Sequence, residues 1–196
     1  TEELAEFIYE REYKGWYCVG CESFKTEKEL VGGDITLTER GAESDGVTCS
    51  IHKQPCQHLT EQVKCFDLKR FAASIEDRLV DKTLSNELRN IIDGDFDFPI
   101  TRKNVGWAIP FEDGTLHCWW EALQCYLFAS GYYRGDEFQE WWPNTLQLCG
   151  KDNLKFQAYI FQAMLLAAGV EQTSEILVHG IILDEKGTKM SKSLGN

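Results

Sequence analysis

Two short pairs of potential metal ligands impose the strongest constraint on how this chain folds. Cys18-Val-Gly-Cys21 is a CxxC pair and Cys49-Ser-Ile-His52 is a CxxH pair, with residues 22–48 between them. Two intervening residues let both side chains of a pair converge on one ion, and two such pairs complete the tetrahedral shell that Zn²⁺ prefers in structural sites. We therefore predict a structural zinc site formed by Cys18, Cys21, Cys49 and His52.

The segment between the two pairs supports this interpretation. Residues 22–48 contain several glycines and many charges, so they offer a loop or hairpin with little core, which a bound metal would organise. The alternatives are unrelated thiols or a redox CxxC pair. Three further side chains could substitute as ligands, namely Cys56, His58 and Cys65. The remaining cysteines have apolar neighbours and are expected to be small core residues, namely Cys118, Cys125 and Cys149.

Composition narrows the class of protein. The 196 residues are 43% hydrophobic, which suits one core plus a small module. The net charge of −12 excludes a surface that grips phosphate backbones throughout, because such a surface needs clustered Lys and Arg. No apolar stretch approaches the ~20 residues that cross a bilayer, and no signal-peptide pattern is present. We expect a cytoplasmic protein with no membrane partner, and we expect the chain to be a fragment because it begins without Met.

The chain divides into three parts by pattern. Residues 1–65 are predicted to form the zinc module, opened by a helix-like segment over residues 4–9. Residues 66–114 are expected to be a helical and loop connection, since apolar residues recur at helical spacing over residues 66–95. Residues 115–196 change to alternating short apolar runs and helices.

The last part has the pattern of a parallel sheet. Strands are predicted over residues 116–119, 146–149 and 176–178, and helices over residues 122–130 and 154–168. Alternating strands and helices of this kind form parallel sheets with right-handed crossovers. In such open sheets, ligands bind beyond the carboxyl ends of the strands.

Polar and aromatic residues follow each predicted strand. Trp119-Trp120-Glu121 comes after the first, Gly150-Lys151-Asp152 after the second and His179-Gly180 after the third. Each has a structural alternative: Trp119 as core, Lys151 and Asp152 as a helix cap, and His179 as a buried histidine with satisfied hydrogen bonds. Their occurrence at successive strand ends favours a binding cleft.

The segment Lys189-Met-Ser-Lys192-Ser closes the pattern, after a turn predicted over residues 184–188. Two lysines in a loop of small residues can close over a polyphosphate and neutralise the charge that moves to the leaving pyrophosphate. The alternative is an ordinary solvated surface loop.

This KMSKS segment matches the second signature of class I aminoacyl-tRNA synthetases. Within that class the chain resembles methionyl-tRNA synthetases, because six further segments resemble that family's, in its order and approximate spacing, at residues 13–22, 49–52, 107–110, 119–122, 150–152 and 178–181. The resemblance implies an α/β fold: the second half of a Rossmann-type parallel sheet, carrying a small zinc-knuckle insertion called the connective peptide.

The resemblance also implies a role for individual residues. The methionine pocket would be lined by Trp119, Ala122, Tyr126, Phe156 and Gln157. The ATP side would include Gly150, Lys151, Asp152, His179 and Gly180. Lys189 and Lys192 of KMSKS would be the catalytic pair, with Lys192 also contacting the ATP phosphates. The implied partners are methionine, ATP with Mg²⁺, and tRNA through the complete protein.

Three positions depart from the family pattern: Glu121 replaces the usual Asp, Gln157 the usual His, and Ser50 the usual Pro. Gln157 can donate and accept hydrogen bonds but does not titrate near neutrality. These changes keep open a divergent relative with an altered amino-acid pocket. A non-catalytic zinc-stabilised binding module is a third hypothesis, against which the intact KMSKS argues. The chain contains no HIGH signature and no anticodon-binding helices, so we expect it to be inactive alone.

Lys192 provides a test of the resemblance. In the complete protein, Lys192→Ala should lower the rate of amino-acid-dependent pyrophosphate exchange by roughly two to three orders of magnitude, because it removes a phosphate contact realised mainly in the transition state. The free energy of unfolding should change little. An unchanged exchange rate would contradict the assigned role.

Overall fold

The structure is a computed structural model that describes residues 5–20, 23–25, 27–33, 46–94, 98–103, 107–135, 137–188 and 190. The chain forms two compact units that interleave along the sequence. The first comprises Thr1–Tyr9, Cys65–Ile100 and Leu116–Asn196, and the second comprises Glu10–Lys64 and Thr101–Thr115. The helices of the described ranges are all too short or too polar to cross a membrane.

A parallel strand pair organises the first unit. Strands β10 (Leu146–Gly150) and β11 (Glu175–His179) pair in register from Leu146↔Glu175 to Gly150↔His179. The connection between them is helical, through η5 (Lys151–Asn153), the π-helix η6 (Phe156–Ile160) and α5 (Phe161–Ala167). The predicted strands 146–149 and 176–178, the predicted helix 154–168 and the parallel pairing are therefore confirmed.

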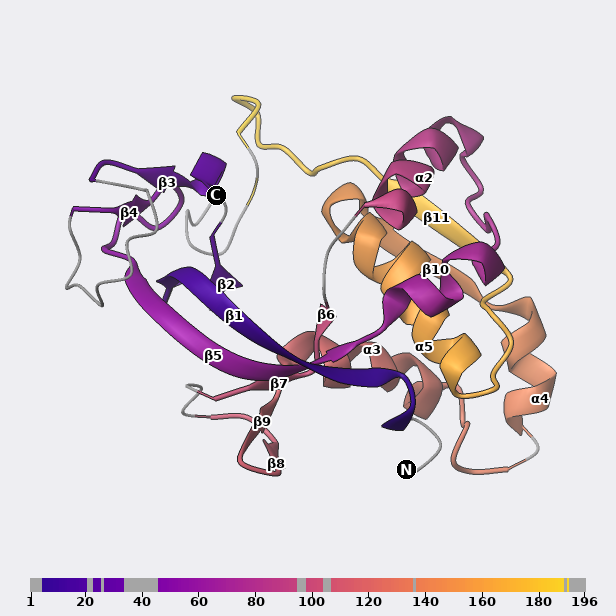
Figure 1. The fold of residues 1–196 in the computed structure, drawn as a ribbon. Coiled ribbons are helices and arrows are strands. Elements are labelled where there is room, and N and C mark those ends of the chain that lie inside the picture. The colour runs from indigo at the N-terminus through magenta and orange to yellow at the C-terminus, as the bar shows by residue number, and fades with distance from the viewer. Residues whose placement is uncertain are drawn as a thin grey trace. The chain divides into compact units, whose positions relative to one another are not determined.

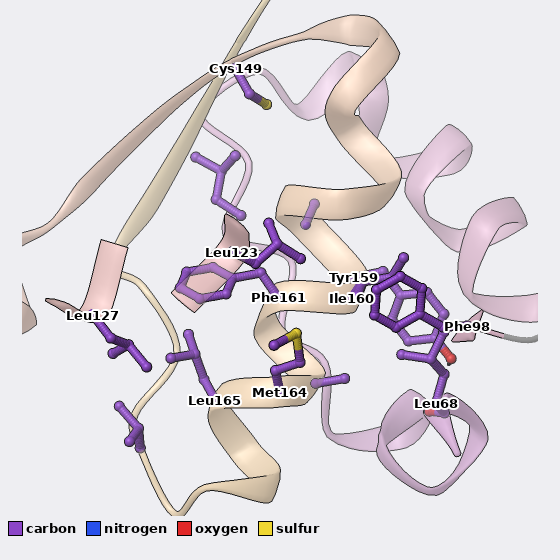
Figure 2. Close-up of a cluster of buried hydrophobic side chains, with 14 of the residues drawn as sticks. Leu68, Phe98, Leu123, Leu127, Cys149, Tyr159, Ile160, Phe161, Met164 and Leu165 are labelled. Atoms are coloured by element: carbon purple, nitrogen blue, oxygen red, sulfur yellow. Dashed lines mark hydrogen bonds between the residues drawn. The ribbon is translucent and has the colours of Figure 1, made fainter. Parts of the chain in front are cut away.

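The helical connection runs through the core of this unit. Every residue from 157 to 165 is buried, and Tyr159, Ile160 and Phe161 are at most 1% exposed. Figure 2 shows these side chains among Leu68, Phe98, Leu123 and Leu127, which come from other elements of the unit. A helix that is apolar on nearly all sides is stable only when it is enclosed, so this segment is the centre around which the unit packs.

The helix expected over residues 66–95 is interrupted. The structure forms η2 (Leu68–Ser74), η3 (Lys82–Leu84) and α2 (Ser85–Asp93), but residues 75–81 are not helical. Instead, the Val80 N–H donates to the Ile176 carbonyl at 2.9 Å, and the Ile176 N–H donates to the Arg78 carbonyl at 2.8 Å. The prediction of a continuous helix is wrong here because this segment pairs with the edge of β11.

The strand expected over residues 116–119 is wrong after Leu116. Strand β9 (Gly114–Leu116) ends at Leu116, and helix α3 (Cys118–Ala129) begins two residues later. His117 is the N-cap residue in extended conformation, and its Nδ1 accepts a hydrogen bond from the Trp119 N–H at 3.2 Å. Trp119 therefore lies in the first turn of a helix. The helix predicted over residues 122–130 is confirmed within α3.

Two further helices complete the first unit, α4 (Glu137–Trp141) and η4 (Trp142–Asn144). They add aromatic packing to the core: the Phe138 and Trp142 rings stack with centroids 5.0 Å apart. Trp142 also donates its indole N–H to the Glu171 carbonyl at 2.7 Å. This bond ties the segment before β10 to the segment before β11.

The second unit is built of strands. Strands β1 (Ile8–Cys18) and β5 (Gln57–Phe66), drawn as long ribbons in Figure 1, are neighbours in a sheet that begins with β2 (Ser23–Phe24). The last residues of β5, Cys65 and Phe66, belong to the first unit and pair there with β6 (Phe98–Pro99). The helix-like segment expected over residues 4–9 is wrong for Ile8 and Tyr9, which start β1. Sheet pairing outweighs the weak local pattern, and the aromatic residues of β1 suit a strand.

Short antiparallel pairs surround this sheet. After the turn η1 (Glu27–Glu29), strand β3 (Leu30–Val31) pairs with β4 (Thr48–Cys49), which agrees with the loop or hairpin expected between the two ligand pairs. Strands β7 (Thr101–Arg102), β9 and β8 (Pro110–Phe111) form a third sheet in the order β7-β9-β8. At Gly114, a Cβ atom would lie 2.6 Å from the Arg102 carbonyl oxygen, so glycine permits this close strand approach.

A buried ion pair stabilises the second unit. The Arg102 guanidinium lies 3.7 Å from a Glu61 carboxylate oxygen, and the two side chains are 7% and 4% exposed. The same guanidinium lies over the rings of Tyr17, at 5.5 Å, and Phe24, at 5.7 Å. Removing one partner of a buried pair costs more than the pair contributes, because a buried charge loses its counter-ion.

Arg102→Met should therefore lower the free energy of unfolding by about 3–5 kcal/mol. The matched control is Arg70→Met, since Arg70 pairs with Asp67 at 3.1 Å but is 51% exposed. This control should cost at most about 1 kcal/mol. Urea unfolding of the chain measures both values. If both variants lost the same free energy of unfolding, the buried Glu61–Arg102 pair would contribute no more than an exposed ion pair.

Candidate functional site

Helix α3 presents three of the predicted pocket residues on one face. Trp119, Ala122 and Tyr126 are spaced three and four residues apart, which places them along the same side of a helix. Ala122 and Tyr126 are exposed, and Trp119 is half-buried. The His117 cap fixes the start of the helix and thus the direction of this face. These side chains are available to a ligand.

The π-helix η6 supplies the other two predicted pocket residues, and the structure brings them against α3. The Phe156 ring stacks on the Trp119 ring with centroids 4.1 Å apart and planes 14° apart. The Gln157 side chain is 4% exposed, and its Nε2 donates to the Tyr126 hydroxyl at 3.0 Å. An aromatic pair and a polar amide–phenol pair thus lie side by side.

The side-chain amide of the buried Gln157 has one acceptor atom, Oε1, that is not bonded to other described residues. Within the described part of the chain, its Oε1 atom is buried and has no hydrogen-bond partner. A buried polar atom without a partner costs free energy, so such atoms mark sites where a ligand or water completes the bonding. The predicted pocket residues therefore combine aromatic rings with one buried acceptor that has no partner among the described residues.

The ends of β10 and β11 bring the next predicted group together. Gly150 is the direct register partner of His179. A Cβ atom on Gly150 would lie 2.8 Å from the Asp152 carboxylate and 3.4 Å from the His179 ring, so glycine allows these groups to approach. Gly180 follows at once and is exposed. The two segments predicted for the ATP side form one continuous edge.

Two charged residues near this edge were not indicated by the sequence. Glu87 on α2 pairs with Lys151 at 3.1 Å, although both side chains are more than 40% exposed. Lys155 lies 5.7 Å from the centre of the Phe156 ring, and burial lowers the pKa of its ammonium group. Lys155 precedes a predicted pocket residue, which is the only sequence signal that could have indicated it.

Cysteines near the pocket differ in burial. Burial raises the pKa of the Cys149 thiol to about 11, with a further contribution from the Asp152 carboxylate, so this thiol is protonated at neutral pH. The expectation of a core position is confirmed for Cys149. It is wrong for Cys118 and Cys125, which are exposed on α3, because that helix turns one side toward solvent.

The turn that precedes KMSKS is present as expected. The Asp184 carboxylate accepts the N–H groups of Lys186 at 2.9 Å and Thr188 at 2.8 Å, and the Gly187 N–H donates to the Asp184 carbonyl at 3.0 Å. The Met190 N–H donates to the Ile182 carbonyl at 3.0 Å, so the chain doubles back on itself. The catalytic predictions Lys189 and Lys192 lie outside the described residues.

In the second unit, three of the four predicted metal ligands converge. Ligand atoms of Cys18, Cys49 and His52 all lie within 4.8 Å of one another, and the Cys18 sulfur is 4.0 Å from the His52 Nδ1. Both thiols are buried. A Cβ atom on Gly20 would lie 2.9 Å from the His52 ring, so glycine permits the backbone at residue 20 to approach the imidazole. Cys21 lies outside the described residues.

The proposed substitute ligands occupy different places. Cys56 is fully buried beside Cys18 and Cys49, and its pKa is raised to about 11 by burial and by those two neighbours. His58 packs edge-on to Trp16, with ring centroids 5.3 Å apart. Within the described part of the chain, neither His58 nor Cys65 joins the three-ligand group. Two soft thiolates and an imidazole are the donor set that zinc prefers, so these residues fit the ion.

Comparison with known proteins identifies the family of the chain. The family described as tRNA synthetases class I (M) matches residues 2–196. A methionine–tRNA ligase of Nostoc sp. is 35% identical over 96% of this chain and 36% of its own length. A methionine–tRNA ligase of Thermotoga maritima is 34% identical over 96% of this chain and 30% of its own length.

Solved structures show the same fold. The crystal structure of Mycobacterium tuberculosis methionyl-tRNA synthetase bound by methionyl-adenylate superposes with a TM-score of 0.75 at 28% identity. The match covers 100% of this chain and 39% of that protein. The α/β fold is thus that of the Rossmann-like class I synthetases. The chain spans about a third of the length of its curated relatives, and it belongs to the methionine branch of the class I tRNA synthetase family.

Proposed function

We propose that the complete protein containing this chain activates methionine with ATP and transfers it to tRNA. The observation that carries the proposal is the meeting of α3 and η6, where the Trp119–Phe156 stack and the Gln157–Tyr126 hydrogen bond bring the predicted pocket residues together. A methionine thioether is flexible and polarizable, and it packs well against aromatic rings. The open Gln157 acceptor adds a polar contact at the same place.

The edge formed by Gly150 and His179 supports an ATP site next to this pocket. Exposed polar side chains lie at the ends of both strands there, namely Lys151 and Asp152 after β10 and His179 at the end of β11. In activation, a carboxylate oxygen of methionine bonds to the α-phosphorus of Mg²⁺-bound ATP as the bond to pyrophosphate breaks. Lys189 and Lys192 would neutralise the charge that develops on the leaving pyrophosphate. The catalytic roles of the chain's own residues are thus binding, orientation and charge neutralisation.

A second candidate is a divergent synthetase with an altered amino-acid pocket. The observation in its favour is Gln157, whose carboxamide differs in reach from the imidazole usual in the family and whose Oε1 has no protein partner in the described residues. A binding module without catalysis is the third candidate. Amino-acid-dependent pyrophosphate exchange by the complete protein separates all three.

In that assay, we expect methionine to give the fastest exchange, with weaker discrimination against other amino acids than an imidazole-containing pocket gives. A response to another amino acid and none to methionine would establish the divergent relative. No response to any amino acid, from a folded protein, would favour the binding module.

The cysteine pattern bears on location. Cys18 and Cys49 lie together with His52 as predicted metal ligands. A metal-binding cysteine pattern is typical of reducing compartments, so we propose the cytoplasm as the place of action.

For the pocket, Trp119→Leu should raise the KM for methionine roughly tenfold to a hundredfold, because it removes the indole face that contacts the thioether. The KM for ATP should stay the same. Trp141→Leu is the matched control, since Trp141 is 61% exposed and lies outside the pocket. Equal KM values in both variants would contradict the assignment of this pocket to methionine.

We also propose that Cys18, Cys21, Cys49 and His52 hold one structural Zn²⁺. The small core around the site supports this, since it consists of six buried residues, three of which are cysteines. A core of this size cannot order its loops alone, and zinc binding contributes folding free energy directly.

Metal analysis tests the zinc site. The purified protein should contain about one zinc per chain, and Cys18→Ser should lose most of it and unfold at lower urea concentration. Cys125→Ser removes an exposed thiol elsewhere and should keep the metal. A protein without zinc, or a Cys18→Ser variant with unchanged zinc content and stability, would remove the proposal.

A further inference from the structure

A second glutamine lies in the buried helical segment, directly behind the pocket. Gln162 is 0% exposed, and its neighbours along the helix, Phe161 and Ala163, are equally buried. A polar side chain at such a position costs free energy unless its donor and acceptor groups are both satisfied. The bonds that Gln162 makes therefore identify what it does.

One hydrogen bond of Gln162 satisfies a backbone carbonyl that the π-turn leaves without its usual donor. In an α-helix the Phe161 N–H would donate to the Gln157 carbonyl, four residues earlier. Here it donates to the Phe156 carbonyl, five residues earlier. The Gln157 carbonyl accepts instead from the Gln162 Nε2 at 2.9 Å. The Gln162 side chain thus replaces the backbone donor that the wider turn withdraws.

The other end of the same amide is anchored to the sheet side of the unit. The Gln162 Oε1 accepts the Thr173 N–H at 3.1 Å, two residues before β11. Its Nε2 also lies 3.4 Å from the Gln147 Oε1 on β10. Gln162 therefore links the π-turn to β10 and to the segment that leads into β11.

The π-turn decides which way the pocket residues point. Each helical residue turns the chain by about 100°, so the extra residue of a π-turn changes the direction of everything before it by a comparable angle. Phe156 and Gln157 are the first residues of this turn, and they meet Trp119 and Tyr126 respectively. Without the turn, both contacts would be lost.

We propose that Gln162 is a positioning residue for the amino-acid pocket. By capping the Gln157 carbonyl and holding the Thr173 N–H, it fixes the π-turn that aims Phe156 and Gln157 at α3. This inference rests on the proposed function, because the pocket's ligand is the amino acid that the enzyme activates. Gln162 does not touch the ligand itself and acts through Gln157.

The chain offers a matched control for a purely structural effect. Gln172 is also a buried glutamine, at 5% exposure, and it also bridges two backbone groups. Its Nε2 donates to the Ser74 carbonyl at 3.1 Å, and its Oε1 accepts the Glu76 N–H at 3.2 Å. None of these partners belongs to the pocket. Methionine has nearly the length and volume of glutamine but cannot donate, so Gln162→Met and Gln172→Met remove equivalent bonds.

Pyrophosphate exchange by the complete protein then separates the two roles. We expect Gln162→Met to raise the KM for methionine about fivefold to thirtyfold and to reduce its selectivity over other amino acids, with the KM for ATP unchanged. Both variants should lower the urea midpoint of unfolding by similar amounts. Only Gln172→Met should leave the KM for methionine unchanged. In a Gln157→Ala background, Gln162→Met should have a smaller effect on this KM, because the two residues act as a unit.

Three outcomes would count against the inference. If Gln162→Met and Gln172→Met both leave the KM for methionine unchanged, while the unsubstituted protein exchanges normally, Gln162 has only a structural role. If the Gln162 and Gln157 effects are fully additive, the proposed route through Gln157 is wrong. If the unsubstituted protein shows no exchange, the proposed function fails and the inference falls with it. Should Gln162→Met not fold, Gln162→Asn keeps the amide but shortens its reach, and it must show the same rise in KM.

Discussion

Enclosure of the helical segment from Gln157 to Leu165 is the constraint on which the first unit depends. Nine consecutive buried residues leave this segment no solvent face, so every neighbouring element has to supply a matching apolar surface. The same enclosure makes its two glutamines, Gln157 and Gln162, structurally decisive, because a buried amide must find partners. The predicted amino-acid pocket is therefore an extension of core packing.

The positions of Gly150 and His179 follow from the register of β10 and β11. Because β10 and β11 are parallel and in register, their carboxyl ends coincide, and Gly150 and His179 become neighbours without any loop having to fold over. The second unit depends on a different kind of interaction. Its small core around Cys18 and Cys49 has six buried residues, of which three are cysteines, and a core of this size suits the metal site that we propose there.

Sequence patterns predicted the helices and strands that are marked by regular runs of apolar residues. They missed the elements whose ends are set by single hydrogen bonds. The strands at residues 146–149 and 176–178 are bounded by turn residues and were found. The expected strand at residues 116–119 failed because His117 caps α3, a role that histidine rarely fills. The break at residues 75–81 depends on pairing with Ile176, far away in sequence. The five pocket residues came from family resemblance, whereas the role of Gln162 needed the π-turn, which no periodicity reveals.

The central claim is that the side chain of methionine binds between α3 and η6. A crystal structure of the complete protein with L-methionine tests it most directly. We expect the thioether to contact the rings of Trp119 and Phe156 and to lie beside the Gln157 amide, with the methionine carboxylate directed toward the strand-end edge at Gly150 and His179. Methionine bound elsewhere, with the Trp119–Phe156 stack closed as in the free protein, would contradict the account.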